Sequence, residues 1–183
     1  KAYIIDRAAK AARKVWPPVD ALLLNIGGDI VVWGRAFEIA IADPGAWYDN
    51  ARPLTTISLQ NAAVATSGSY ARGGHLTDSL SGQSHSSAVA ATVVASDVVT
   101  ANALATTLCL TGAADGLRLV ESTPGAEGLR VASGILQRTS GFAQLERSQV
   151  AHPPAASNWP TGYRVTITLP LTLPGLITGA LLV

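Results

Sequence analysis

Sulfur-containing residues are almost missing from this chain. Among its 183 residues there is one cysteine, Cys109, and no methionine. A lone cysteine excludes an internal disulfide, and no Cys/His spacing typical of a structural zinc site is present. The fold must therefore be held by its apolar core and its hydrogen bonds.

Charged residues are also few. They make up 14% of the chain, the net charge is +1, and hydrophobic residues make up 48%. This balance predicts a globular protein and gives no electrostatic case for nucleic acid as a partner. Five of the thirteen basic residues lie within the first fourteen positions, which indicates a solvated helix face. A length of 183 residues suits one domain with a sizeable core.

Several common motifs are absent. The chain contains no G-x-G-x-x-G fingerprint, no P-loop and no G-x-S-x-G elbow. These absences argue against a Rossmann dinucleotide site, a Walker-type site and a serine-hydrolase site.

The last nineteen residues, Val165 to Val183, carry no charge. Their length would suffice for a membrane helix, and this alternative stays open. However, apolar residues alternate with threonine and proline from Val165 to Leu173, which is typical of a half-buried strand. Pro170 and Pro174 would also break a helix. A strand or extended arm is the favoured prediction.

Elsewhere the pattern predicts more strands than helices. A helix is expected from Ile4 to Val15, ending before Pro17 and Pro18, and another from Val98 to Leu110, capped by Ser96 or Asp97 and followed by Gly112 at the C′ position. A short helix is expected over Ala114 to Glu121. Predicted strands cover Ala21–Ile26, Ile30–Trp33, Phe37–Ala42, Leu54–Leu59, Ala62–Ala65, Ala88–Ala95, Leu129–Ala132 and Ile135–Arg138. Because strands and helices do not alternate regularly, we predict an α+β fold with a largely antiparallel sheet and packed helices.

The chain divides by composition into three parts. Residues 1–147 carry the regular pattern and form the predicted main domain. Residues 148–158 are rich in proline, alanine and serine and are predicted to be a linker. Residues 159–183 would form a strand-like arm or begin a further β domain.

The segment from Ala62 to Asp78 concentrates the chemistry. Thr66-Ser67-Gly68-Ser69 follows a strand and is predicted to form a turn whose hydroxyl and N–H groups could face phosphate oxygens, with Arg72 adding a charge. His75 lies three residues from Asp78, so the carboxylate could stabilise a charged imidazole acting as general base. An ordinary turn and a surface loop are the alternatives.

Two further places could bind ligands. Asn102 and Thr106 are four residues apart on the predicted helix, so their oxygens share a face that would suit Mg²⁺. Polar surface is the alternative. Gly27-Gly28-Asp29 is either a tight turn with a capping carboxylate or part of a binding site.

Five segments, in order, resemble the ApbE family of flavin transferases. Lys1-Ala-Tyr-Ile-Ile-Asp6 is similar to the family's Lys-Gly-Tyr-x-x-Asp, and Asn25-Ile-Gly-Gly-Asp29 to its N-x-G-G-D turn. Ala63 to Tyr70 is similar to A-x-S/T-S-G-x-Y, His75-Leu-Thr-Asp78 to the start of H-x-x-D-P-x-T-G, and Asn102-Ala-Leu-Ala-Thr106 to D-A-x-x-T. Ala2, Ser79 and Asn102 replace the family's Gly, Pro and Asp.

The resemblance implies a T-fold-like architecture and a defined activity. Family members bind FAD with Mg²⁺ and transfer FMN to a threonine hydroxyl of an acceptor flavoprotein, releasing AMP. By position, His75 would be the base, and Asn102 and Thr106 would hold the metal. The implied flavin-binding residues are Lys1, Asp6, Gly27, Gly28, Asp29, Thr66, Ser67, Gly68, Tyr70, Arg72 and Asp78.

The differences from the family lead to further expectations. Without a carboxylate at Asn102, Mg²⁺ should bind more weakly than in a relative with Asp. The resemblance covers only the family's C-terminal portion, so a separate N-terminal half could complete the site. Binding of FAD without turnover, or Mg²⁺-dependent hydrolysis of FAD to FMN and AMP, are the alternative functions. The resemblance also implies a periplasmic, membrane-anchored location.

Overall fold

The computed structural model describes residues 1–15, 20–46, 51–68, 88–147, 165–168 and 178–182. Three α-helices lie in these residues: α1 (Ala2–Val15), α2 (Val98–Leu110) and α3 (Ala113–Ser122). A short 3₁₀ helix, η1, covers Phe142–Gln144. The strands are β1 (Leu22–Ile26), β2 (Asp29–Trp33), β3 (Phe37–Ile41), β4 (Thr55–Leu59), β5 (Ala62–Gly68), β6 (Ala90–Ala95), β7 (Glu127–Ala132), β8 (Ile135–Arg138), β9 (Val165–Thr168) and β10 (Thr178–Leu182).

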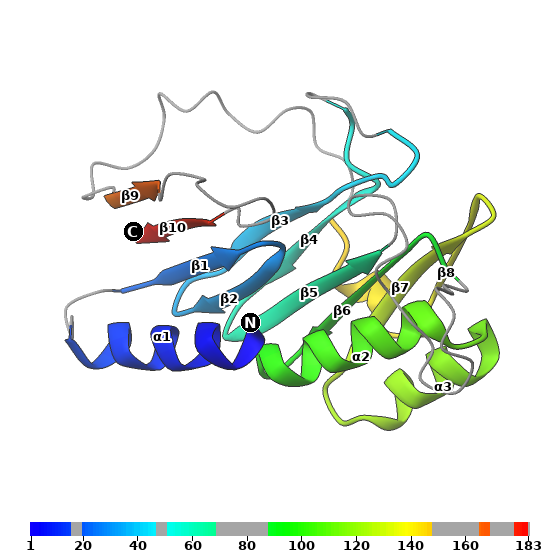
Figure 1. The fold of residues 1–183 in the computed structure, drawn as a ribbon, viewed down its shortest axis with the longest axis horizontal. Coiled ribbons are helices and arrows are strands. Elements are labelled where there is room, and N and C mark those ends of the chain that lie inside the picture. The colour runs from blue at the N-terminus through cyan, green and yellow to red at the C-terminus, as the bar shows by residue number, and fades with distance from the viewer. Residues whose placement is uncertain (16–19, 47–50, 69–87, 148–164, 169–177, 183) are drawn as a thin grey trace.

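Eight strands form one antiparallel sheet in the order β8-β7-β6-β5-β2-β1-β10-β9. Strands β3 and β4 pair with each other in a separate two-stranded sheet. Figure 1 shows β5 and β6 in the middle of the large sheet, directly above α2. The predicted α+β fold with a largely antiparallel sheet is therefore confirmed.

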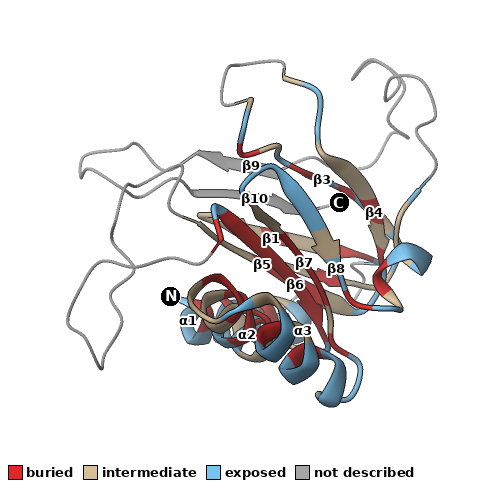
Figure 2. Ribbon diagram, turned by 90° about the vertical axis from the view of Figure 1, so that its right-hand side faces the viewer, coloured by how far each residue is buried: buried red, intermediate tan, exposed pale blue. Residues whose placement is uncertain are grey.

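The large sheet is covered differently on its two faces. Figure 2 shows the three helices together below the sheet, with β3 and β4 on the opposite side. One core cluster joins α2 to β5 and β6, and another joins α1 to β1, β2 and β5. A third cluster fills the opposite face, where Phe142 of η1 and Ile57 of β4 are fully buried. A binding site on the helix side of the sheet must therefore lie where no helix covers the ends of the strands.

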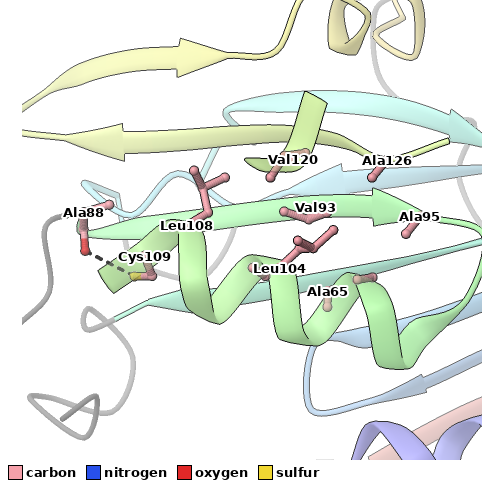
Figure 3. Packing of buried hydrophobic residues seen from close by; sticks show 12 residues of the cluster. Ala65, Ala88, Val93, Ala95, Leu104, Leu108, Cys109, Val120 and Ala126 are labelled. Carbon is pink, nitrogen blue, oxygen red and sulfur yellow. Dashed lines mark hydrogen bonds between the residues drawn. The ribbon is translucent and has the colours of Figure 1, made fainter. Parts of the chain in front are cut away.

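Helix α2 packs closely on the sheet because small residues line its buried side. Ala101 and Ala105 are fully buried, and Leu108 fills the space against α3 and β7. Figure 3 shows Leu104 and Leu108 among the packed residues of the core cluster that joins α2 to β5 and β6, with the Cys109 thiol directed at the Ala88 carbonyl oxygen, 3.3 Å away. This packing fixes the rotation of α2 and therefore which of its polar residues face the ends of the strands.

The start of α2 is fixed by Asp97, as predicted. Its Oδ1 accepts hydrogen bonds from the backbone N–H groups of Val99 and Thr100, at 3.0 and 2.9 Å. Partial burial opposes ionisation of Asp97, but these bonds, the Thr100 hydroxyl and the charge of Lys10 outweigh it and lower its pKa. Gly112 follows the C-cap residue Thr111, yet its φ of −61° is not left-handed. Gly112 therefore does not form a left-handed C-terminal cap of α2. It serves as the N-cap of α3.

The predicted end of the strand that begins at Ala62 is wrong. Thr66, Ser67 and Gly68 were expected to form a turn after a strand that ends at Ala65, but β5 continues through Gly68. These three residues pair with Thr92, Ala91 and Ala90 of β6. The pairing satisfies their backbone groups, which outweighs the local preference of Ser and Gly for turns.

The tail contributes two strands to the sheet. Strand β9 covers part of the predicted alternating segment, and β10 pairs with β1, with Leu24 opposite Ala180. None of the described helices is long and apolar enough to span a membrane. The predicted linker, residues 148–158, lies outside the described residues.

Candidate functional site

Lys1, Asp29, Ser67, Asn102 and Thr106 form one cluster of side-chain contacts on the helix side of the sheet, in which the Asn102 backbone carbonyl oxygen also takes part. Below, this set is called the polar cluster. It joins the start of α1, the start of β2, the end of β5 and the middle of α2. These elements are distant in sequence, so the cluster exists only in the folded chain.

Asp29 is positioned by a tight turn between β1 and β2. Ile26 pairs with Asp29, and the two loop residues Gly27 and Gly28 have φ values of 59° and 87°. Positive φ at both positions is typical of a type I′ hairpin turn, which glycine adopts without strain. The Gly28 N–H donates to Asn25 Oδ1 at 3.2 Å. The turn directs the Asp29 side chain into the protein, where it is 0% exposed.

The buried Asp29 carboxylate has two partners. Asn102 Nδ2 donates to both carboxylate oxygens, at 3.2 and 3.1 Å. Lys1 Nζ lies 3.3 Å from Oδ2 and also donates to the Gly27 carbonyl oxygen at 2.9 Å. A buried carboxylate without partners would be very costly, so these contacts are what allow Asp29 to be buried.

The contact with Asp29 also fixes the orientation of the Asn102 amide. An ionised carboxylate only accepts hydrogen bonds, so the NH₂ group must face it and Oδ1 must point away. No hydrogen bond to Asn102 Oδ1 is formed within the described part of the chain. Asn102 therefore presents a neutral oxygen acceptor that is held in place by Asp29.

Thr106 and Ser67 extend the cluster toward the end of β5. Thr106 Oγ1 donates to the Asn102 carbonyl oxygen at 3.0 Å and lies 3.0 Å from Ser67 Oγ. Both side chains are partly buried. Asn102 and Thr106 thus lie on one face of α2, as predicted. Ser67 of β5 contacts Thr106 from the sheet.

Other predicted site residues lie elsewhere. Thr66 points to the opposite face of the sheet, where its Oγ1 is 2.9 Å from Thr92 Oγ1, because adjacent strand residues alternate in direction. Gly68 is the last residue of β5. Asp6 pairs with Lys10 one turn along α1, at 2.7 Å. Tyr70, Arg72, His75 and Asp78 fall outside the described residues, and their roles stay predictions.

The oxygen atoms of the polar cluster are ligands that suit a hard cation. The charge of the cluster suits such a cation less well. Asn102 Oδ1 and Thr106 Oγ1 are oxygen ligands of the kind Mg²⁺ takes, but both are neutral. Across the described ranges, no group of three or more His, Cys, Asp or Glu residues could hold a metal. The cluster could thus supply two oxygens of a coordination shell, with the remaining ligands and the negative charge coming from a bound molecule.

Sequence reasoning missed the contact of Asn102 with Asp29 and that of Lys1 with Asp29. The residues of each contact belong to separate sequence motifs, and 73 positions separate Asn102 from Asp29. No local pattern carries a signal for such a contact.

The chain is similar to one protein family in sequence and to several solved structures in fold. The model of the ApbE family matches residues 1–129. The crystal structure of the ApbE protein from Thermotoga maritima superposes with a TM-score of 0.67 at 26% identity, over 80% of this chain and 51% of that chain. The apo form of the flavinyl transferase ApbE from Pseudomonas stutzeri gives 0.64 at 26%, over 80% and 47%. No curated protein matches significantly.

The flavin transferase ApbE from Vibrio cholerae shares the fold, with a TM-score of 0.62 at 22% identity over 79% of this chain and 50% of that one. The chain thus spans about half the length of the solved structures it matches. The predicted ApbE-like architecture is confirmed over this part.

Proposed function

Because this chain belongs to the ApbE family, we propose that it carries part of a flavin transferase site that moves FMN from FAD to a threonine hydroxyl of an acceptor flavoprotein. The observation that supports this most directly is the polar cluster. It links an oriented amide, two hydroxyl groups and an ammonium group through hydrogen bonds and one ion pair, from the end of β5 to the turn between β1 and β2. Such a set can position a diphosphate.

In the proposed reaction, the threonine oxygen forms a bond to the phosphorus of the FMN moiety. The phosphoanhydride bond breaks at the same phosphorus, and AMP leaves with the bridging oxygen. His75 would accept the proton of the attacking hydroxyl. Bound Mg²⁺ would neutralise charge on the diphosphate oxygens, and Asn102 and Thr106 are the residues that would hold it.

The described residues of the cluster act by positioning. Asp29 fixes the Asn102 amide, and Thr106 is fixed by its own bond to the Asn102 carbonyl oxygen. Lys1 Nζ, whose side chain is 36% exposed, could donate to a phosphate oxygen while it stays near Asp29. We propose that the rest of the flavin pocket comes from an N-terminal half, since the solved relatives are about twice as long as the matched region.

The test is covalent flavin transfer. The protein is incubated with FAD, Mg²⁺ and an acceptor flavoprotein, with and without the N-terminal half of the longer Thermotoga maritima relative. A fluorescent acceptor band on a denaturing gel, with AMP released in equal amount, is expected. An acceptor whose target threonine is changed to alanine is the matched control and should stay unlabelled.

Other results would assign other functions. FAD retained without AMP release would indicate a binding protein without turnover, an alternative favoured by the neutral Asn102. AMP released without any acceptor would indicate hydrolysis of FAD by water. Absence of labelling even with the N-terminal half supplied would contradict the transferase proposal.

A further inference from the structure

We infer that this chain takes its divalent cation only together with a diphosphate, as the metal–diphosphate chelate, and does not bind the free ion. The inference rests on the proposed function. It concerns the form of the ligand that the polar cluster accepts, which neither the fold nor the family match decides.

The charge of the polar cluster does not favour a free cation. Asp29 contributes one negative charge, and Lys1 Nζ, 3.3 Å away, contributes one positive charge. Ser67, Asn102 and Thr106 are neutral, so the five side chains carry no net charge. A free Mg²⁺ ion would gain little attraction here to offset the loss of its hydration shell, which it gives up reluctantly.

The carboxylate of Asp29 is already engaged in hydrogen bonds. Both of its oxygens accept from Asn102 Nδ2, and the side chain is fully buried. A cation coordinated by Asp29 would have to displace the amide and lie beside the Lys1 ammonium, whose like charge repels it. Asp29 therefore acts as a positioning residue for Asn102 and is not available as a ligand.

The candidate ligands that remain in the cluster are neutral. Asn102 Oδ1 accepts no hydrogen bond within the described residues, and Thr106 Oγ1 belongs to a hydroxyl that donates to the Asn102 carbonyl oxygen, so both oxygens are neutral. Mg²⁺ in proteins is commonly held by one or two carboxylates together with phosphates of a substrate. Because the described residues of the cluster add no net negative charge, the diphosphate is the ligand that supplies it, while Lys1 offers a further attraction for it.

The first experiment measures binding by isothermal titration calorimetry. MgCl₂ alone, FAD alone, and FAD in the presence of MgCl₂ are titrated into the protein. We expect no saturable binding of MgCl₂ alone up to millimolar concentrations. We expect FAD to bind about tenfold more tightly, or better, when Mg²⁺ is present, the usual size of a favourable coupling.

The second experiment uses thermal unfolding in EDTA and in MgCl₂, without nucleotide. The wild-type Tm should be the same in both. In Asn102→Asp, two carboxylates would meet where Asn102 now donates, so its Tm should fall by about 5 °C or more in EDTA and recover in MgCl₂. Asn102→Ala is the matched control: it loses the amide without adding charge, and its Tm should fall equally in both conditions.

Two outcomes would overturn the inference alone. One is saturable binding of free Mg²⁺ to the wild-type protein, and the other is a rise of the wild-type Tm in MgCl₂. Either would leave the flavin transfer proposal intact. An Asn102→Asp variant that is equally stable in EDTA and MgCl₂ would remove the support that the inference takes from charge, because an added carboxylate would then not create a site for the free ion. If FAD fails to bind with or without Mg²⁺, the proposed function is contradicted and the inference with it.

Discussion

At position 102 an amide, and not a carboxylate, faces the buried Asp29. The two groups have nearly the same shape, but the amide donates hydrogen bonds whereas a carboxylate would repel Asp29. Because of this single difference, Asn102 binds Asp29 together with Lys1. The difference also predicts weaker Mg²⁺ binding here than in Asn102→Asp, and equal affinities would contradict that expectation.

Thr106 offers a direct test of the cluster. Thr106→Val removes the hydroxyl that contacts Ser67 Oγ and the Asn102 carbonyl oxygen. We expect the Mg²⁺-dependent affinity for FAD to fall about tenfold or more, because a ligand and a positioning hydrogen bond are lost together. Calorimetric titration of FAD in MgCl₂ measures this change.

Thr107→Val is the matched control for Thr106→Val. Thr107 Oγ1 makes the same kind of bond along the helix, to the Ala103 carbonyl oxygen at 3.0 Å, but it has no contact with Ser67. Both variants should lose a similar, small amount of stability, and only Thr106→Val should lose affinity for FAD. Equal losses of affinity would show that the cluster does not bind the ligand.

Helix α2 connects the cluster to the fold at the scale of an element. Its buried side consists of small and aliphatic residues, and its polar residues 102 and 106 lie beside the ends of β2 and β5. The cap at Asp97 and the closely packed alanines fix the helix against β5 and β6. Movement of α2 would therefore separate Asn102 from Asp29 and Thr106 from Ser67.

The Asp97 cap predicts a dependence of stability on pH. Asp97→Ala should cost about 1 kcal/mol at neutral pH, because two backbone N–H groups lose their acceptor. Since the pKa of Asp97 is lowered from 3.8, the ionised form stabilises the folded state above that pH. This contribution should be lost as the pH falls below 3.8 through the pKa of the folded state.

Urea unfolding from neutral to acidic pH measures this contribution. Asp97→Asn is the control, since it keeps a side-chain oxygen as cap but cannot ionise. The stability difference between wild type and Asp97→Asn should shrink as the pH is lowered. A difference that does not change with pH would rule out the ionised cap.

The whole molecule is a sheet covered by helices on one side and by β3, β4 and η1 on the other (Figure 2). The cluster lies where α1 and α2 meet the same face of the sheet. Its geometry therefore depends on the packing of both helices, and in particular on the core between α2, α3 and β7.

Leu108→Ala tests the packing of α2 against α3 and β7. Leu108 is 1% exposed and fills the space between α2, α3 and β7, so the variant should leave a cavity and lose about 3 kcal/mol of stability. Leu119→Ala on α3 is the control, because Leu119 is 43% exposed and its loss should cost much less. Guanidinium unfolding measures both, and similar costs would contradict the described layering.

The sequence by itself determined the local features of this protein. The ends of α2, the β7–β8 hairpin, the Gly27-Gly28 turn and the pairing of Asn102 with Thr106 all follow from rules that reach only a few residues along the chain. The five family segments were also readable directly from the sequence.

The tertiary structure alone decided how these features meet. It extended β5 through Gly68, turned Ser67 toward Thr106 and Thr66 toward Thr92, and brought Asp29 against Asn102. Strand ends and faces depend on which neighbours pair with and cover the strand, and those neighbours come from distant parts of the chain. For the same reason, the sequence alone did not predict the net charge of the polar cluster. That charge depends on the folding that places Lys1 beside Asp29.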